Sequence, residues 1–244
     1  MSPDTPAYYV WACRETPNLP FNIGLHDALT GEVLFGQPKM KDTGRSRAAD
    51  IDPTSRGWEM WGSTNTPLQS VAGEVLSESC PSSMNMKMYW DGDLHDSSSV
   101  MNIYKWDWEK KQLNSILKAE GSASNGGTKG QTCLIADIFG DWRAELVVRT
   151  ADNKEMRIYS TTDETVYRMP TLMHDATYRE AVAWQNNHYN QPANTSFYLG
   201  AETTHVPVPE IYTIDTEGKK KVAEAYENQT KEHIFMKIGG QKAE

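Results

Sequence analysis

Short strand-like runs separated by turn residues dominate the sequence, and they constrain its fold more than any other feature. Seven runs rich in β-branched and aromatic residues fit this pattern: 8–11, 32–35, 87–90, 102–106, 145–149, 156–159 and 210–214. Turn-forming stretches such as DALTGE (27–32) and DGD (91–93) lie between them, as expected for hairpins and loops. Only 175–186 has a helical pattern, and it is short. The sequence therefore predicts an all-β fold.

One internal repeat narrows the fold class further. Ala49-Asp50-Ile51-Asp52, followed by 59–61, recurs as Ala136-Asp137-Ile138, followed by Asp141 and 145–147. Each copy contains a short strand, a turn with Asp, a Glu and a second strand. Asp137 lies 87 residues after Asp50, about twice the length of a four-stranded propeller blade. Together with the many short strands and the recurrent aromatic residues, this spacing favours a β-propeller or a large β-sandwich over an α/β fold, and we prefer the propeller.

Composition and charge argue against several classes of protein. The net charge of −9 does not suit a protein that binds nucleic acid or a membrane surface through a basic face. No apolar run approaches the roughly 20 residues of a membrane span, and the first residues lack the basic and apolar segments of a secretory signal. The histidines form no HExxH pattern, so catalytic zinc is unsupported.

The three cysteines, Cys13, Cys80 and Cys133, are widely spaced and form no CxxC pair. Neither a disulfide framework nor a structural zinc site is therefore expected. A single disulfide bond remains possible if the protein is exported. We expect buried or inert thiols.

Acidic residues gather in the two repeated turns. The first turn has Asp50, Asp52 and Glu59, and the second has Asp137, Asp141 and Glu145. Such oxygen ligands suit calcium, which prefers about six to eight of them and tolerates loop geometry. Asp also favours turns for a local reason, because its side chain accepts hydrogen bonds from nearby backbone amides. Since the two turns match in register, we predict calcium at both, with the local interpretation left open.

Several distinctive motifs run through most of the chain: GLHDALTGE (24–32), AADIDP (48–53), YWDGDL (89–94), SNGGTK (124–129), ADIFGDWRAELVVRT (136–150), RIYSTT (157–162), LMHDATYREAVAWQNNHYNQP (172–192) and SFYLGAE (196–202). Together they resemble the rhamnogalacturonan lyases of polysaccharide lyase family 11. The stretch 172–192 is the most specific, because its aromatic, amide and charged residues follow an order that no generic strand requires.

The resemblance implies an eight-bladed β-propeller with bound calcium ions, which cleaves the galacturonate–rhamnose backbone of pectin by elimination. Family members are much longer, and this sequence resembles their C-terminal part, about four blades. We therefore expect 1–218 to form a partial propeller and 219–244 a final strand or tail. A fragment, a natural short relative, or a ring completed by a second copy or another chain would each explain the length.

The resemblance also implies which residues act on the substrate. In the family, an Asn-Gly-Thr-Lys loop contacts the sugar, and its lysine, a proposed catalytic residue, aligns with Lys129. Thr128 and Gly127 align with the preceding residues of that loop. Tyr189 aligns with a second catalytic candidate. Without the resemblance, Lys129 is equally a solvated loop charge, and Tyr189 a packed residue with a satisfied hydroxyl.

The sequence departs from the family pattern at two places. Gly126 stands where the family typically has Asn, although Asn125 lies one position earlier. We include Asn125, Gly126, Gly127 and Thr128 in the predicted substrate-binding loop. Ser46 and Arg47 stand where family members usually carry Gly and Met, and an Arg there is expected to reshape the central channel.

Other conspicuous residues have structural interpretations. We predict that Trp61, Trp90, Trp106 and Trp142 pack within the blades rather than stack on sugar. We favour a hydrogen-bonded core position for His174 over one that lines the channel with Asp175.

Three functions remain open from the sequence. The first is a calcium-dependent lyase acting on rhamnogalacturonan I, and the second is a catalytically incomplete carbohydrate-binding remnant. The third, a scaffold that never meets sugar, is disfavoured by the match of the substrate loop. The resemblance implies an extracellular or periplasmic protein.

Overall fold

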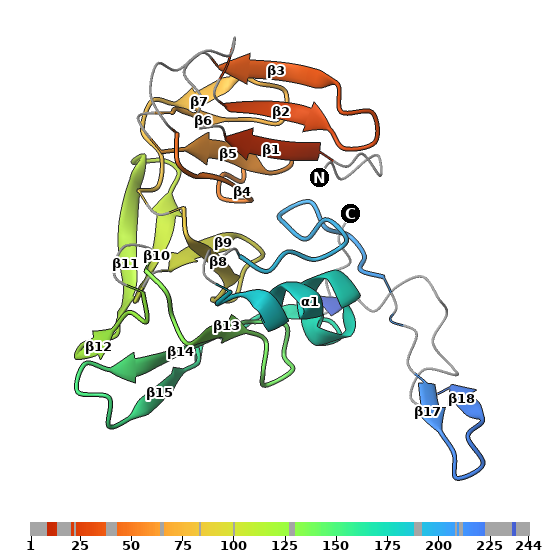
Figure 1. Cartoon of the computed structure of the whole chain (residues 1–244). Coiled ribbons are helices and arrows are strands. Elements are labelled where there is room, and N and C mark those ends of the chain that lie inside the picture. Colours follow the sequence, from red (N-terminus) through yellow and green to blue (C-terminus); the bar gives the residue numbers. More distant parts are fainter. Residues whose placement is uncertain are drawn as a thin grey trace.

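A computed structural model of the chain contains several small antiparallel sheets and one α-helix (Figure 1). The structure describes residues 9–13, 21, 23–37, 43–63, 66–82, 84–99, 101–126, 130–187, 192–207, 209, 212–222 and 236–237. The predicted all-β class is confirmed.

Four consecutive sheets make up most of the structure. Sheet 1 contains β1 (Tyr9–Cys13), β2 (Ile23–Asp27) and β3 (Val33–Gln37). Sheet 2 contains β4 (Ser46–Ala49), β5 (Glu59–Gly62), β6 (Leu68–Gln69) and β7 (Val75–Ser77). Sheet 3 contains β8 (Met86–Tyr89), β9 (Asp96–Ser99), β10 (Asn102–Asp107) and β11 (Gln112–Lys118). Sheet 4 contains β12 (Ser122–Ala123), β13 (Leu134–Ala136), β14 (Glu145–Thr150) and β15 (Met156–Tyr159).

Strand order follows the chain in sheets 1, 2 and 3. In sheet 4, β14 lies at the centre, with β15 along one edge and β12 and β13 along the other. The four sheets follow one another around α1 in Figure 1, and no sheet closes on itself within the described ranges. The seven strand-like runs predicted from the sequence correspond to β1, β3, β8, β10, β14, β15 and β17.

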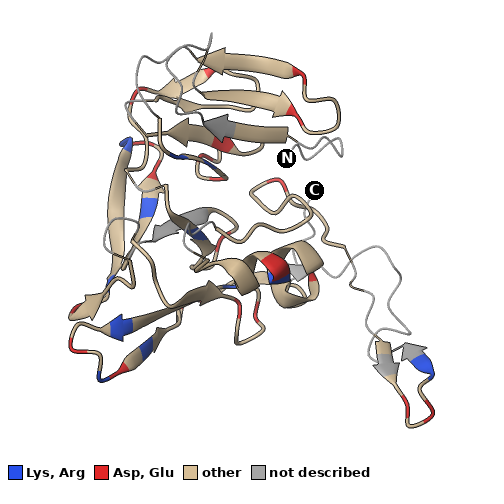
Figure 2. Cartoon of the chain, in the orientation of Figure 1, with Lys and Arg blue, Asp and Glu red and all other residues tan. Residues whose placement is uncertain are grey.

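Burial explains why the strands differ in composition. β5 and β8 are buried at every residue, because both of their faces are covered. The edge strand β11 alternates between exposed and half-buried residues along most of its length. Alternation of this kind is expected where only one face of a strand is packed. Acidic residues lie in turns that join strands, for example within 151–155 (Figure 2).

Apolar layers join neighbouring sheets. Between sheets 3 and 4, Met88, Ile103 and Leu146 belong to one buried cluster. A second cluster links sheets 2 and 3 through Trp61 and Trp106. The predicted packing role of the four tryptophans is confirmed, since Trp61, Trp90, Trp106 and Trp142 are 0%, 4%, 6% and 1% exposed.

The helix α1 (Ala176–Trp184) follows a short 3₁₀-helix, η1 (Leu172–His174), and confirms the helical prediction for 175–186. The Asp175 carboxylate caps α1 by accepting a 2.8 Å hydrogen bond from the Tyr178 amide. His174 is exposed, so its predicted core position is wrong. The reason is that η1 turns only Leu172 fully inward.

Side chains of the α1 segment pair with the free edge of β13. The Gln185 carboxamide oxygen accepts a 2.7 Å bond from the Ile135 amide, and its nitrogen donates a 2.8 Å bond to the Ile135 carbonyl. Asn186 donates to the Cys133 carbonyl at 2.6 Å. The buried Gln185 carboxamide therefore makes the two hydrogen bonds with Ile135 that one residue of a neighbouring strand would make.

The C-terminal region adds two small ladders. β16 (Tyr167–Arg168) pairs with β19 (Met236–Lys237), and β17 (Tyr212–Ile214) forms a hairpin with β18 (Lys220–Val222). The predicted boundary at 218/219 falls in the turn of this hairpin. None of the described helices is long and apolar enough to cross a membrane. Cys80 and Cys133 are free, half-buried thiols, and the side chain of Cys13 lies outside the described residues.

Replacing Gln185 with Leu is expected to lower the free energy of unfolding by about 2–4 kcal/mol, because it leaves the buried Ile135 amide and carbonyl unpaired. Urea unfolding measures this loss. Asn187→Ala is the matched control, since Asn187 is exposed and its loss should stay within about 0.5 kcal/mol. Equal stabilities of the two variants would contradict this role for Gln185.

Candidate functional site

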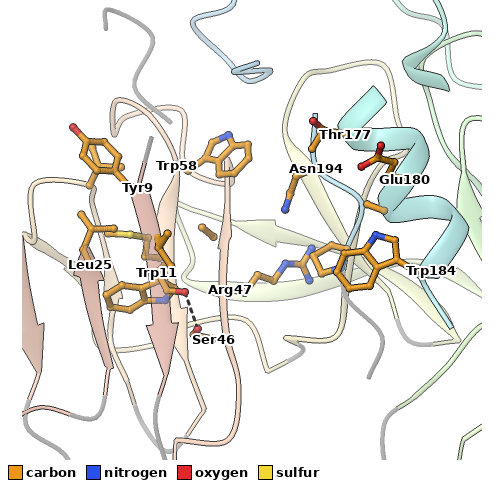
Figure 3. Close-up of a pocket in the computed structure, with 16 residues that line it drawn as sticks. Tyr9, Trp11, Leu25, Ser46, Arg47, Trp58, Thr177, Glu180, Trp184 and Asn194 are labelled. Atoms are coloured by element: carbon orange, nitrogen blue, oxygen red, sulfur yellow. Dashed lines mark hydrogen bonds between the residues drawn. The ribbon is translucent and has the colours of Figure 1, made fainter. Parts of the chain in front are cut away.

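A pocket of about 530 Å³ opens between the inner strands of sheets 1 and 2 and the helix α1 (Figure 3). Its volume lies within the range of small-molecule sites, about 300–1,000 Å³. Trp11 and Trp58 contribute aromatic surface on the sheet side, and Trp184 does so on the helix side. The Trp184 side chain is 51% exposed, which is unusual for so large an apolar group.

One face of α1 forms the helical wall of the pocket. Thr177, Glu180, Ala181 and Trp184 all line it, and their spacing places them on the same side of a helix. A neighbouring side of the helix carries Tyr178, which is 4% exposed. The helix thus anchors one face in the protein and presents a polar and aromatic face to the pocket.

Arg47 is the cation of this pocket. It projects from β4, and Figure 3 shows its side chain extending toward Trp184. The residue is only 4% exposed. One guanidinium nitrogen donates to the Met86 carbonyl, and the guanidinium carbon lies 5.6 Å from the centre of the Trp61 ring. These contacts hold a buried positive charge at the pocket wall.

The repeated turns share one hydrogen-bond pattern. In the first, Glu59 Oε2 accepts from the backbone amides of Ile51 and Asp52, each at 2.9 Å. In the second, Glu145 Oε2 accepts from the amides of Ile138 and Phe139 at 2.9 and 3.1 Å. The internal repeat is therefore a structural repeat, in which a buried Glu holds the turn that precedes its own strand.

The first Asp of each turn binds a distant segment. Asp50 Oδ2 accepts from the Tyr198 hydroxyl at 2.6 Å and from the Ala201 amide at 2.9 Å. Asp137 Oδ2 accepts from Trp142 N, Thr171 Oγ1 and Leu172 N at 3.1, 2.6 and 2.9 Å. Both carboxylates join a sheet to the chain around α1.

The remaining two predicted ligands have other partners. Asp52 accepts two hydrogen bonds from Thr54 and lies 3.3 Å from the Lys111 ammonium. Asp141 pairs with Arg143 at 2.6 Å. Of the predicted ligands, Asp50 thus lies near Glu59, and Asp141 lies near Glu145 while it pairs with Arg143. The Asp52 and Asp137 carboxylates are directed to other partners.

The fit of calcium to these turns can be judged from their donors. Burial raises the pKa of Glu59 to about 8, so a cation would have to displace its proton at neutral pH. Asp137 Oδ2 already accepts three hydrogen bonds. Within the described ranges, no group of three or more His, Cys, Asp or Glu side chains is arranged to hold a metal ion. These turns do not offer the oxygen cage that calcium requires, and calcium stays a prediction from the resemblance.

The YWDGDL motif forms an ionic cluster. Lys105 Nζ lies 2.6 Å from Asp91 and 2.5 Å from Asp93, and His95 lies 3.5 Å from Asp93 and 3.7 Å from Asp50. Burial alone would lower the pKa of His95, but the hydrogen bond to Asp93 and the nearby carboxylates raise it. Lys105 therefore supplies the positive charge between Asp91 and Asp93.

The stem of the predicted substrate loop is well defined. Asn125 N donates to Gln131 O at 2.8 Å, and Arg149 Nε donates to the Asn125 side chain at 3.0 Å. A Cβ atom at Gly126 would meet the flexible end of the Gln131 side chain, which would have to move to admit a larger residue. Gly127, Thr128 and Lys129 lie outside the described residues, as does Tyr189.

Sequence reasoning missed most of the pocket. None of the described residues predicted to bind substrate or metal lines it, whereas Ser46 and Arg47, noted only as departures, both do. Trp58, Glu180 and Asn194 were not singled out. The spacing of Thr177, Glu180, Ala181 and Trp184 was the sequence pattern that could have indicated a shared helix face.

Sequential antiparallel sheets beside an aromatic pocket with a few polar groups define the class of this molecule as a β-sheet protein with a concave surface site. Comparison with known proteins narrows this class. The chain matches the family model "Rhamnogalacturonan lyase family 11, C-terminal domain" over residues 1–209. It therefore belongs to rhamnogalacturonan lyase family 11, as its motifs predicted.

Two curated relatives come from Bacillus subtilis (strain 168). The chain is 43% identical over 214 residues to the rhamnogalacturonan endolyase YesW, covering 87% of this chain and 34% of that protein. It is 41% identical over 228 residues to the rhamnogalacturonan exolyase YesX, covering 87% of this chain and 37% of that protein. The chain thus spans about a third of the length of these relatives.

Solved structures give the same result. The crystal structure of YesW aligns with a TM-score of 0.80 at 44% identity, covering 84% of this chain and 35% of that one. The Bacillus licheniformis rhamnogalacturonan lyase aligns with a TM-score of 0.79 at 44% identity, covering 83% and 34%. The fold described above is therefore the fold of the C-terminal part of these lyases.

The hydrogen bonds of Asp137 predict a loss of stability that does not depend on calcium. Asp137→Asn replaces an acceptor by an amide and is expected to cost about 2–4 kcal/mol, equally in chelator and in excess calcium. Chemical unfolding in the two buffers measures both values. Asp141→Asn is the control, because its side chain is 45% exposed. A loss for Asp137→Asn that appears only with calcium would identify Asp137 as a ligand instead.

Proposed function

We propose that this chain takes part in the eliminative cleavage of the galacturonate–rhamnose backbone of rhamnogalacturonan I, as a lyase of family 11. The observation that carries the proposal is the similarity to YesW and YesX, which extends over 87% of the chain at 43% and 41% identity. The pocket between sheets 1 and 2 and α1 supports it, because aromatic walls with a few polar groups suit a sugar ring.

Elimination makes three chemical demands. The negative charge that develops at the uronate carboxylate must be stabilised, so that the proton on C5 becomes acidic. A base must then take that proton, and the leaving oxygen at C4 must receive one. Calcium, if bound, would supply positive charge to the carboxylate.

We assign the proton transfers to Lys129 and Tyr189, on the resemblance of their motifs. Lys129 follows a stem that is fixed by the Asn125 and Arg149 hydrogen bonds. A lysine on a fixed stem can be positioned against the substrate more precisely than one on a free loop. Tyr189 follows α1, whose end is held by Gln185.

Several further features belong to this proposal. The four consecutive sheets are part of an eight-bladed propeller, and another set of blades, from a second copy or another chain, completes the ring. Calcium bound outside the repeated turns is also part of this proposal, in keeping with the net charge of −9. The protein acts in an extracellular or periplasmic compartment.

A second candidate is a carbohydrate-binding module that does not cleave. The length of the chain, about a third of its curated relatives, favours this alternative. Gly126 favours it as well, because an amide of the substrate loop is replaced by hydrogen.

Incubation with rhamnogalacturonan I is expected to raise the ultraviolet absorbance as unsaturated uronate ends form. Lys129→Ala should lower this rate at least a hundredfold, and Tyr189→Phe about tenfold or more, as expected for loss of a general acid or base. Lys154→Ala is the matched control, because its side chain is 81% exposed. A folded protein that binds the polymer without any rise in absorbance would favour the non-cleaving module.

Completion of the ring by a second copy predicts a dimer at micromolar concentration. Light scattering should give about twice the 27.5 kDa mass of one chain. A mass of one chain at all concentrations would contradict the homodimer and leave another chain as the partner.

A further inference from the structure

We propose that Arg149 and Asn125 are positioning residues for the lyase reaction, because together they close the neck of the predicted substrate loop that carries Lys129. The neck comprises 124–126 and 130–132, the described residues on the two sides of this loop. This inference rests on the proposed function and deepens it. It gives Arg149 a role in the reaction, and it assigns the Asn125 side chain to the support of the loop instead of to the sugar.

The guanidinium of Arg149 joins the neck to the turn between β14 and β15. Its Nε donates a 3.0 Å hydrogen bond to the Asn125 side-chain oxygen, and Nη2 donates to the Ser124 carbonyl. Nη1 donates to Asn153 Oδ1 at 2.9 Å and to the Thr150 carbonyl at 3.2 Å. A planar guanidinium holds several acceptors in fixed directions at once. Arg149 therefore fixes one side of the neck to sheet 4.

The Asn125 carboxamide is engaged within the protein at both ends. Its oxygen accepts the hydrogen bond from Arg149 Nε, and its nitrogen donates to the Thr132 carbonyl at 3.2 Å. The same nitrogen lies 3.4 Å from Cys133 Sγ. Thr132 is on the second side of the neck and is 1% exposed. Because these contacts use most of the hydrogen-bonding capacity of one carboxamide, Asn125 joins the two sides of the neck.

The Ser124 hydroxyl and the backbone complete the closure. Ser124 Oγ accepts from Gln131 N at 2.8 Å and from Gly126 N at 3.1 Å, and Asn125 N donates to the Gln131 carbonyl at 2.8 Å. Lys129 stands two residues before Gln131 in the sequence, so the covalent chain keeps its backbone within about 7–8 Å of this fixed point. A restricted backbone lowers the entropy that is lost when a side chain is aligned with a substrate.

Kinetics on rhamnogalacturonan I test the positioning role. Arg149→Lys keeps the charge but loses the forked donors, and Asn125→Ala removes their acceptor. Each should lower kcat about tenfold or more and change KM less than twofold. The double variant should be about as slow as the slower single variant, because the two residues act as one unit. Arg157→Lys is the matched control on the adjacent strand β15, since Arg157 binds Glu155 and the Glu120 carbonyl, and its kcat should not change.

Limited digestion with trypsin tests the neck without relying on catalysis. Trypsin cleaves after lysine, so the rate of cleavage after Lys129, followed by mass spectrometry, reports how often the loop opens. Arg149→Lys and Asn125→Ala should each raise this rate about tenfold, as expected for the loss of one or two hydrogen bonds. Cleavage after Lys219, whose side chain is 74% exposed, is the internal reference and should not change.

The two measurements separate this inference from the proposed function. Faster cleavage after Lys129 in the variants of a protein that never forms unsaturated ends would support the closure of the neck and contradict the lyase. Unchanged cleavage and unchanged kcat would overturn the inference and leave the lyase intact. A rise in KM confined to Asn125→Ala would also overturn it, because Asn125 would then be a sugar ligand. If melting curves show that Arg149→Lys does not fold, Asn125→Ala decides by the same two measurements.

Discussion

Buried carboxylates that accept backbone hydrogen bonds are the interaction on which the rest of the structure depends. Glu59 and Glu145 each bind two amides of the turn that precedes their own strand. A buried acidic group is costly unless donors surround it, so each turn and the strand that follows it stabilise one another. Asp50 and Asp137 likewise accept hydrogen bonds from the segments around α1. The repeated acidic turns thus fix the relation between the sheets and the central helix.

The helix lies against the edge of β13, where side chains at its C-terminal end bind backbone groups of that strand. Gln185 supplies both a donor and an acceptor to Ile135, as a neighbouring strand would. This pairing fixes the rotation of α1, and the rotation decides which residues face the pocket. Trp184 is therefore exposed to the pocket for the same reason that Gln185 is buried: the two are adjacent on a helix whose orientation is set by hydrogen bonds.

Local patterns predicted most of the fold and little of the pocket. The runs at 145–149 and 156–159 are strands because β-branched and aromatic residues between turn residues specify a strand locally. The helix was recognisable for a similar reason. The pocket, in contrast, joins Arg47 and Trp58 to Trp184 and Asn194, and no local pattern reveals which strands α1 will face. His174 was misplaced because its burial depends on how η1 docks, which its neighbours in sequence do not encode.

The distribution of charge in this acidic chain differs between the repeated turns and the pocket. At the repeated turns, negative charge is buried and satisfied by backbone amides, or in the case of Glu59 neutralised by a raised pKa, so its field at a distance is reduced. The cations Arg47 and Lys87 are buried beside the pocket, where screening is weak. The acidic groups that shape the repeated turns and the basic side chains of Arg47 and Lys87 are therefore separate sets, which allows both kinds of charge to be buried in one small structure.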